Sequence, residues 1–165
     1  MKNSGTLKVT TPTDRQIVMT RVFNAPRRLV YEAMSKPELL KRWLLGPPGW
    51  SMVTCDDDLR VGGAFRWTWR GPGGEEMTIH GTYREVAPPQ RVVRTEIMEF
   101  GNSQVGEQLA SIVLTEDGDK TTLTLTLDYA SKEARDVAIA SGMEHGVAAS
   151  YDRLADLLAE SSKQR

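Results

Sequence analysis

The sequence predicts an α+β fold, in which a curved antiparallel sheet of about seven strands wraps around a long C-terminal helix. Residues 131–160 contain no proline, start with Ser131 as a helix-capping residue, and repeat apolar side chains with a helical period. Before them the chain consists mainly of short β-branched and apolar runs separated by turn residues. An amphipathic helix of this length needs a surface to cover its apolar side, and the predicted sheet supplies that surface.

The apolar stripe of the predicted C-terminal helix occupies about a third of its circumference. His145 falls on the opposite side and is expected to face solvent. Gly142 and Gly146 flank the stripe, where they predict either a bend or a close approach by another backbone. The stripe consists of Ile139, Ala140, Met143, Val147, Tyr151, Leu154, Leu157 and Leu158.

Length and composition predict one domain over residues 15–161, with a flexible N-terminal segment (1–14) and a flexible tail (162–165). The net charge of −1 argues against a general affinity for nucleic acid, because no basic surface exists to neutralise phosphates. Cys55 is the single cysteine, which excludes an internal disulfide and fits the reducing cytoplasm. No apolar run is long enough to predict a membrane span.

The elements follow one another in a simple order. A first strand over residues 16–24 is followed by two short helices that begin at Pro26 and Pro37, a favourable residue for a first helical turn. The last predicted strand alternates leucine with threonine, so one of its faces lies on a core. After the two helices the predicted strands are 51–59, 64–70, 77–86, 91–100, 108–115 and 121–129.

Four blocks and the closing helix carry a resemblance to a known family. The blocks are VFNAPRRLVYEAMSKPELLKRWL, GPPGW, DLRVGGAFRWTWR and EVAPPQRVVRTE, and the closing segment is SGMEHGVAASYDRLADLL. They resemble the bacterial branch of the START and Bet v 1-like (SRPBCC) superfamily that is named for the activator of Hsp90 ATPase homologue domain. The resemblance covers about residues 16–160 and implies a helix-grip fold with incompletely filled space between sheet and helix. Relatives often carry tryptophan where Val147 stands.

One predicted strand places three large rings on a single face, because Phe65, Trp67 and Trp69 alternate along it. Such rings either wall a ligand cavity or fill a plain core, and the resemblance favours a cavity. Tyr83 and Tyr151 carry the hydroxyls that would bind the polar end of a ligand. The predicted cavity residues are Phe65, Trp67, Trp69, Met77, Ile79, Tyr83, Met143, Val147 and Tyr151.

The sequence predicts no catalytic residue, no metal site and no cofactor. His80 shares a face with threonines, and no histidine pair has metal-ligand spacing with carboxylates. Cys55 is expected to be a small buried side chain. The run 56–58, three aspartates, is typical of a solvated strand end. Apart from the two tyrosines, no acid or base is predicted to face the interior.

The function predicted from these features is non-catalytic binding of a small hydrophobic or amphipathic molecule, such as a lipid. The expected site is a pocket of a few hundred Å³ between sheet and helix, beside Val147. One alternative is a cyclase- or hydrolase-like enzyme of the same superfamily, which requires an inward-facing acid or base.

A second alternative is an Hsp90-type co-chaperone. The eukaryotic co-chaperone has a separate N-terminal domain with an asparagine- and tryptophan-rich motif, whereas here only residues 1–14, mostly polar, precede the first strand. The sequence leaves the oligomeric state, including a homodimer, open.

Overall fold

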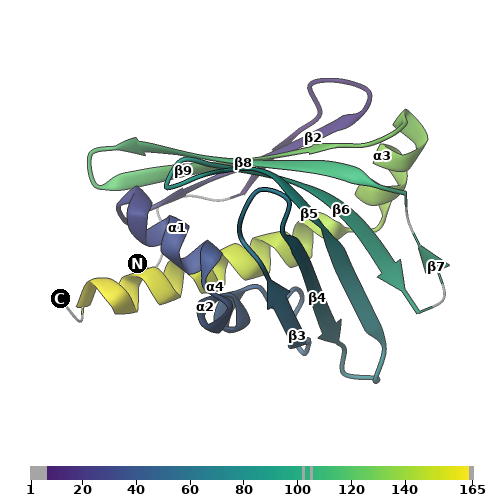
Figure 1. The fold of residues 1–165 in the computed structure, drawn as a ribbon, viewed down its shortest axis with the longest axis horizontal. Coiled ribbons are helices and arrows are strands. Elements are labelled where there is room, and N and C mark those ends of the chain that lie inside the picture. The colour runs from purple at the N-terminus through teal and green to yellow at the C-terminus, as the bar shows by residue number, and fades with distance from the viewer. Residues whose placement is uncertain (1–6, 102, 105, 164–165) are drawn as a thin grey trace.

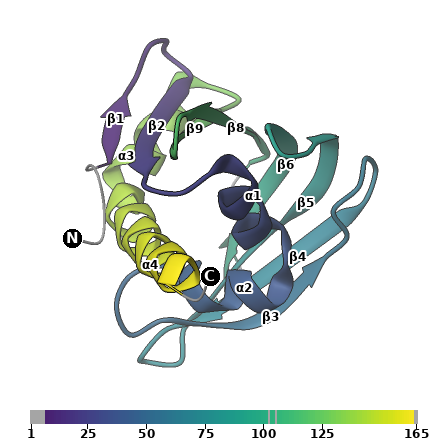
Figure 2. The same cartoon turned by 90° about the vertical axis from the view of Figure 1, so that its left-hand side faces the viewer.

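The computed structural model describes residues 7–101, 103–104 and 106–163. In this part of the chain one curved antiparallel sheet wraps around a long C-terminal helix, as the sequence predicted (Figures 1 and 2). Two short helices, α1 (Arg27–Ser35) and α2 (Pro37–Trp43), follow the first long strand, and both pack against the C-terminal helix. No helix among the described residues is both long and apolar enough to cross a membrane.

The described part of the sheet contains nine strands in the order β1-β2-β9-β8-β6-β5-β4-β3, with β7 paired to β6 beside this path. The first long strand therefore pairs with the last one, from Gln16 opposite Asp128 to Phe23 opposite Thr121. The strands are β1 (Lys8–Thr10), β2 (Gln16–Phe23), β3 (Ser51–Asp57), β4 (Ala64–Arg70), β5 (Glu76–Ala87), β6 (Arg91–Phe100), β7 (Ser103–Gln104), β8 (Gln108–Asp117) and β9 (Lys120–Asp128).

Two differences concern the ends of the domain. Strand β1 lies inside the segment 1–14 that was expected to be flexible, and it pairs with β2. The C-terminal helix continues to Lys163, into the predicted tail. Residues 1–6 and 164–165 of the predicted flexible ends lie outside the described residues.

The hydrophobic core fills the space between the concave face of the sheet and the helices. Strand β9 shows the predicted alternation, because Leu123, Leu125 and Leu127 are buried while the threonines between them are not. A buried cation also belongs to this core: Arg21 on β2 is 2% exposed and forms an ion pair of 2.9 Å with Asp152 on the C-terminal helix. The pair connects the C-terminal helix to β2.

The predicted single helix over residues 131–160 is in fact two helices, α3 (Lys132–Ala140) and α4 (Met143–Lys163). Ser131 caps α3 as predicted, since its Oγ accepts a hydrogen bond from the backbone N–H of Ala134 at 3.0 Å. The break falls at Gly142, whose φ of 74° lies in the left-handed region. Because α3 turns away at this point, Ile139 and Ala140 are exposed, and their prediction as part of the buried stripe was wrong.

The sequence left open whether Gly142 and Gly146 bend the helix or allow another segment to approach it closely. The structure shows one of these roles for each glycine. Gly142 bends the chain, whereas Gly146 allows a close approach by the loop after α2. A Cβ added at Gly146 would lie 3.3 Å from Cδ of Pro47. The N-terminal half of α4 is thereby packed against Gly46 and Pro47, and α2 packs beside it.

The substitution Gly142→Ala is expected to lower the free energy of unfolding by about 1–2 kcal/mol, because an L residue is strained at positive φ. Urea unfolding monitored by circular dichroism measures the change. Ser141→Ala, at the neighbouring exposed position, is the control and should change stability by less than about 0.5 kcal/mol. An unchanged or higher stability of Gly142→Ala would mean that α3 and α4 can join into one helix.

Candidate ligand-binding site

The three predicted rings of β4 lie side by side on the concave face of the sheet. Phe65, Trp67 and Trp69 are 2%, 3% and 4% exposed, which confirms the predicted strand face. The ring centroids of Phe65 and Trp67 are 4.6 Å apart, and those of Trp67 and Trp69 are 6.2 Å apart in an edge-to-face arrangement. The indole N–H of Trp69 donates to the backbone carbonyl of Leu44 at 2.7 Å.

The other predicted cavity residues on the sheet extend this aromatic surface. Met77 and Ile79 on β5 pair with Trp69 and Trp67 and are partly buried against the core. Tyr83, also on β5, is buried, with its ring centroid 5.3 Å from that of Phe65.

The predicted residues on α4 reach the same core from the opposite side. Met143 and Val147 are partly buried. Tyr151 is buried, and its ring packs against Phe23 and Trp43 at centroid distances of 5.9 and 6.0 Å. Burial raises the pKa of the Tyr151 hydroxyl. These ring contacts tie α4 to β2 and α2.

The concave face also carries an ion pair that the sequence did not predict. Arg94 and Glu96 on β6 have side chains that are only 13% and 8% exposed, with 2.8 Å between Arg94 Nε and Glu96 Oε2. The guanidinium of Arg94 lies 4.8 Å from the Trp67 ring centroid and 5.5 Å from that of Phe65, which gives favourable cation–π contacts. Gln108 donates to Glu96 Oε1 at 3.0 Å, so both oxygens of Glu96 have partners.

A second unpredicted group is the carboxylate of Asp57 at the end of β3. The hydroxyl of Tyr83 donates to Asp57 Oδ1 at 2.6 Å, and the indole N–H of Trp67 donates to Oδ2 at 3.1 Å. Burial raises the pKa of Asp57, and these two hydrogen bonds only partly oppose that rise. Burial also raises the pKa of the Tyr83 hydroxyl.

Two expectations about charged residues are therefore corrected. The aspartate run was expected to be a solvated strand end, which holds for the exposed Asp56 and Asp58 but not for Asp57. The expectation that no acid or base besides the two tyrosines faces the interior was also wrong, because Asp57, Arg94 and Glu96 do so. The physical reason is that each finds partners there: the two neutral donors for Asp57, and each other for Arg94 and Glu96.

One sequence signal could have revealed the ion pair. Val92, Arg94 and Glu96 share strand parity, and Val92 belongs to the buried core. The opposite parity is equally apolar, with Val93 and Ile97, so alternation alone does not choose between the two faces. The signal is the pair of opposite charges, Arg94 and Glu96, two residues apart on the same face of the strand. Because the two can neutralise each other, they can face the interior without leaving an unpaired buried charge.

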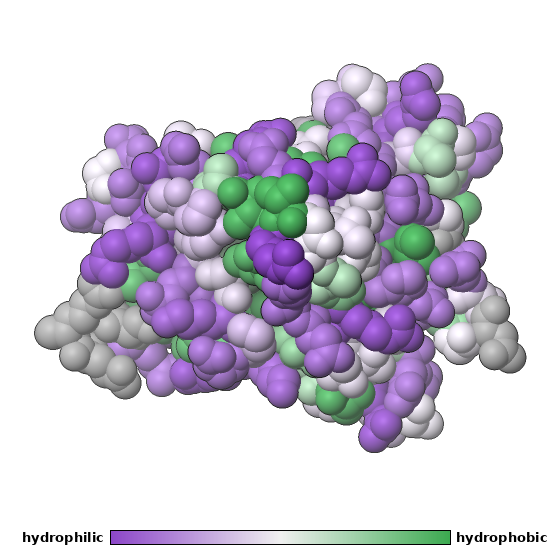
Figure 3. Space-filling model, in the orientation of Figure 1, coloured by the Kyte–Doolittle hydropathy of each residue, from purple (hydrophilic) through white to green (hydrophobic). Residues whose placement is uncertain are grey.

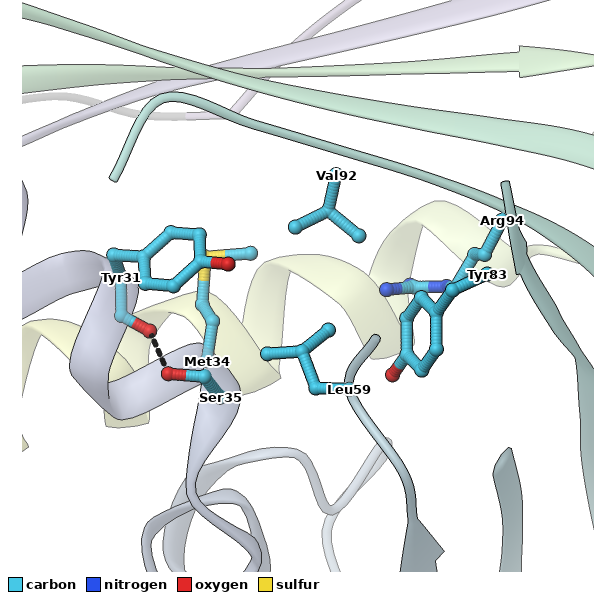
Figure 4. Close-up of a pocket in the computed structure, with 7 residues that line it drawn as sticks. All are labelled: Tyr31, Met34, Ser35, Leu59, Tyr83, Val92 and Arg94. Carbon is cyan, nitrogen blue, oxygen red and sulfur yellow. Dashed lines mark hydrogen bonds between the residues drawn. The ribbon is translucent and has the colours of Figure 1, made fainter. Parts of the chain in front are cut away.

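A small cavity of about 10 Å³ lies between α1 and the strands β5 and β6 (Figure 4). The hydroxyl of Tyr31 is buried at this cavity and has no hydrogen-bond partner within the described part of the chain. A cavity of this size holds about one water molecule. The cavity is bordered by α1, by the loop between β3 and β4, and by β5 and β6. Its lining residues are Tyr31, Met34, Ser35, Leu59, Tyr83, Val92 and Arg94.

A second hollow of about 440 Å³ is open to solvent on the convex face, around Arg66, His80 and Thr82. Val147 lines neither of these two spaces, and the predicted pocket beside Val147 stays a prediction. The face of the molecule seen in Figure 3 is mainly hydrophilic, with apolar side chains in small separate groups.

His80 lies on the convex face, away from the interior groups. Its Nε2 is 2.8 Å from Glu99 Oε2, and Arg66 also approaches this carboxylate at 3.7 Å. These side chains are between 27% and 52% exposed, as expected for a surface ion-pair network.

The substitution His80→Ala is expected to change the free energy of unfolding by less than about 1 kcal/mol, the usual range for an exposed ion pair. Thermal unfolding measures this, with His145→Ala as an exposed control on α4. Loss of a measurable turnover in the His80 variant alone would show that the convex face takes part in chemistry.

The raised pKa of Asp57 predicts a pH dependence of stability. The folded protein holds the Asp57 proton more tightly than the unfolded chain does, so the carboxylate form opposes folding. Relative to Asp57→Asn, the unmodified protein should therefore lose stability as the pH rises from the ordinary carboxyl range through the raised pKa. Urea midpoints of both proteins over this pH range measure the difference. A gain of relative stability with rising pH would contradict the prediction.

The family model described as "Activator of Hsp90 ATPase homolog 1-like protein" matches residues 24–159. Among curated proteins, none matches the chain. The matched region runs from the end of β2 to the C-terminal part of α4, so it includes every residue of the candidate site.

Solved bacterial structures share the fold over almost the whole chain. A protein from Rhodobacter sphaeroides is 29% identical, with a TM-score of 0.87 over 94% of this chain and 99% of that one. A protein from Nitrosomonas europaea is 25% identical, with a TM-score of 0.82 over 93% and 99% of the two chains. A protein from Mycobacterium smegmatis, 23% identical with a TM-score of 0.83 over 95% and 99%, shares the fold.

Proposed function

The chain belongs to the family of activator of Hsp90 ATPase homolog 1-like proteins, and on this premise we propose that it binds a small amphipathic molecule without transforming it. Membership supports a ligand-binding or co-chaperone-like domain. The bound molecule would lie between the concave face of the sheet and the helices. The single cysteine of the chain, Cys55, fits such a role in the cytoplasm.

The observation that carries the proposal is a set of polar groups at the edge of an aromatic core. The Tyr31 hydroxyl has no partner among the described residues, and it shares a cavity with Tyr83 and Arg94. Small-molecule sites typically combine an apolar surface with a few such convergent polar groups. Here the rings of Phe65 and Trp67 supply the apolar surface next to them.

Binding requires the cavity to widen, because about 10 Å³ is too small for an amphipathic molecule. Two apolar side chains close it, Met34 from α1 and Leu59 from the β3–β4 hairpin (Figure 4). Both are only partly buried, and methionine adapts readily to a changed shape. We therefore place the entry between α1 and this hairpin, and the apolar part of the ligand towards Val147 on α4.

Two measurements test the proposal. Native mass spectrometry of the freshly purified protein should show a co-purifying small molecule. Nile red, a neutral apolar dye, should bind the folded protein with increased fluorescence and be displaced by that molecule. Val147→Trp should weaken dye binding about tenfold by filling the interior. Val137→Trp, on the exposed face of α3, is the control and should leave binding unchanged.

The ligand-binding proposal is wrong if the protein carries no co-purifying molecule and Nile red does not bind to it. If the dye binds equally well to the wild type and to Val147→Trp, the site does not extend beside α4.

An enzyme acting on the bound molecule is the second candidate function, and one observation favours it. A cyclase- or hydrolase-like enzyme needs an acid that faces the interior. Asp57 is such an acid, and it accepts a 2.6 Å hydrogen bond from the Tyr83 hydroxyl. Incubating the protein with the co-purified molecule and following its mass separates the two functions. An unchanged mass supports binding alone, and a product that disappears in Asp57→Asn supports catalysis.

A further inference from the structure

The polar end of the ligand can be assigned a charge from the partners of the buried groups, provided that the proposed function holds. Arg94 at first suggests a site for a carboxylate. Its Nε, however, lies 2.8 Å from Glu96, and its guanidinium stacks over Trp67 and Phe65. The charge of Arg94 is therefore already neutralised by a buried partner of opposite sign.

Asp57 is in a different position, because both of its hydrogen bonds come from neutral donors. The Tyr83 hydroxyl and the Trp67 indole each occupy one oxygen, at 2.6 and 3.1 Å. Arg94 is the cation whose charge acts on Asp57, and its Nε pairs with Glu96 instead. A carboxylate offers about four acceptor positions, so about two remain for a ligand.

The local charge balance points in the same direction. Around Asp57 the interior groups are one cation, Arg94, and two acidic side chains, Glu96 and Asp57, while the other core cation, Arg21, pairs with Asp152. An added carboxylate would increase the excess of negative charge in a partly buried site, whereas an added ammonium would cancel it. The ring of Tyr83, whose hydroxyl donates to Asp57, would also favour a cation.

Asp57 is also within reach of the entry. It is half-buried, and Leu59, which closes the small cavity, follows it by two residues in the same hairpin. Tyr83 lines this cavity and donates to Asp57, so a ligand that displaces Leu59 arrives beside the hydroxyl that holds the carboxylate. We propose that the ligand is a cationic amphiphile, an amine with an apolar tail, whose ammonium pairs with Asp57.

The test compares three probes with the same tail: octylamine, octan-1-ol and octanoate, each displacing Nile red at neutral pH. Octylamine should bind about tenfold more tightly than octanoate, with the alcohol between them. Asp57→Asn should abolish this preference. Asp56→Asn, an exposed neighbour on the same strand, is the matched control and should keep it. If Asp57→Asn does not fold, Tyr83→Phe replaces it, since it leaves the carboxylate in place and should retain or strengthen the preference for the amine.

The possible outcomes separate the two proposals. Tighter binding of octanoate, or an amine preference that survives Asp57→Asn, would overturn the assignment of charge and leave ligand binding intact. With Tyr83→Phe as the substitute, loss of the amine preference would overturn it too. If none of the three probes displaces the dye, or the dye itself does not bind, the proposed function fails together with this inference.

Discussion

Replacing Arg94 by alanine is expected to lower the free energy of unfolding by about 3–5 kcal/mol, the range for breaking a buried ion pair from one side. Glu96, which is 6% exposed in the intact protein, would keep only Gln108 of its two partners, Arg94 and Gln108. The rings of Trp67 and Phe65 would also lose the guanidinium that covers them. The loss comes mainly from the unpaired carboxylate and only partly from lost packing.

A double variant separates these two causes. Arg94→Met combined with Glu96→Leu removes both charges and keeps most of the volume, so it should recover most of the stability lost in Arg94→Ala. Urea unfolding of the single and the double variants measures the recovery. A loss below about 1 kcal/mol in Arg94→Ala would mean that the pair behaves like an exposed one.

Trp67→Ala is expected to cost about 3–5 kcal/mol, the usual loss for a large aromatic side chain in a packed core. Trp67 is 3% exposed and lies between the rings of Phe65 and Trp69. Its indole also donates to Asp57, so the substitution removes one of the two donors to a half-buried carboxylate. Packing and hydrogen bonding therefore act in the same direction.

The exposed neighbour Arg66 provides the control, because Arg66→Ala on the convex face should change stability by less than about 1 kcal/mol. Thermal and urea unfolding measure both variants, and Nile red titration measures binding. A loss in Trp67→Ala well below the expected range, together with weaker dye binding, would show that the ring borders space rather than packed core.

The fold was predictable because its strongest signals are local. Strands β4 and β6 begin and end at the predicted residues, 64–70 and 91–100, since turn residues mark their ends. The alternation of leucine and threonine likewise predicted the buried face of β9. Each of these features depends on neighbouring residues alone.

The polar part of the candidate site was not predictable in this way. The register between β3 and β4 shifts between Met52 and Thr54, and this bulge brings Met52, Cys55 and Asp57 to one face. Strict alternation would separate Met52 from Asp57. The position of a bulge depends on the partner strand, so the inward direction of Asp57 follows from tertiary structure.

The break between α3 and α4 was missed for a related reason. Helix propensity assigns Gly142 and Gly146 the same cost, and both flank the predicted stripe. Only the neighbours distinguish them, because Pro47 packs against Gly146 whereas Gly142 has a left-handed backbone. A single helix was the expected result of a pattern that contains no information on these contacts.

The pairing of β2 with β9 has a consequence for the order of events during synthesis. Gln16 donates to Asp128 across 112 residues of chain, and β2 has no other neighbour in the described sheet except the three-residue β1. While the ribosome is still adding the middle strands, β2 therefore has no long strand to pair with along its edge. Closing so large a loop makes folding slow relative to helical proteins. The nascent chain consequently leaves β2, one of its core strands, without its long partner until translation has passed residue 128. The sheet is completed only after β9 has left the ribosome and paired with β2.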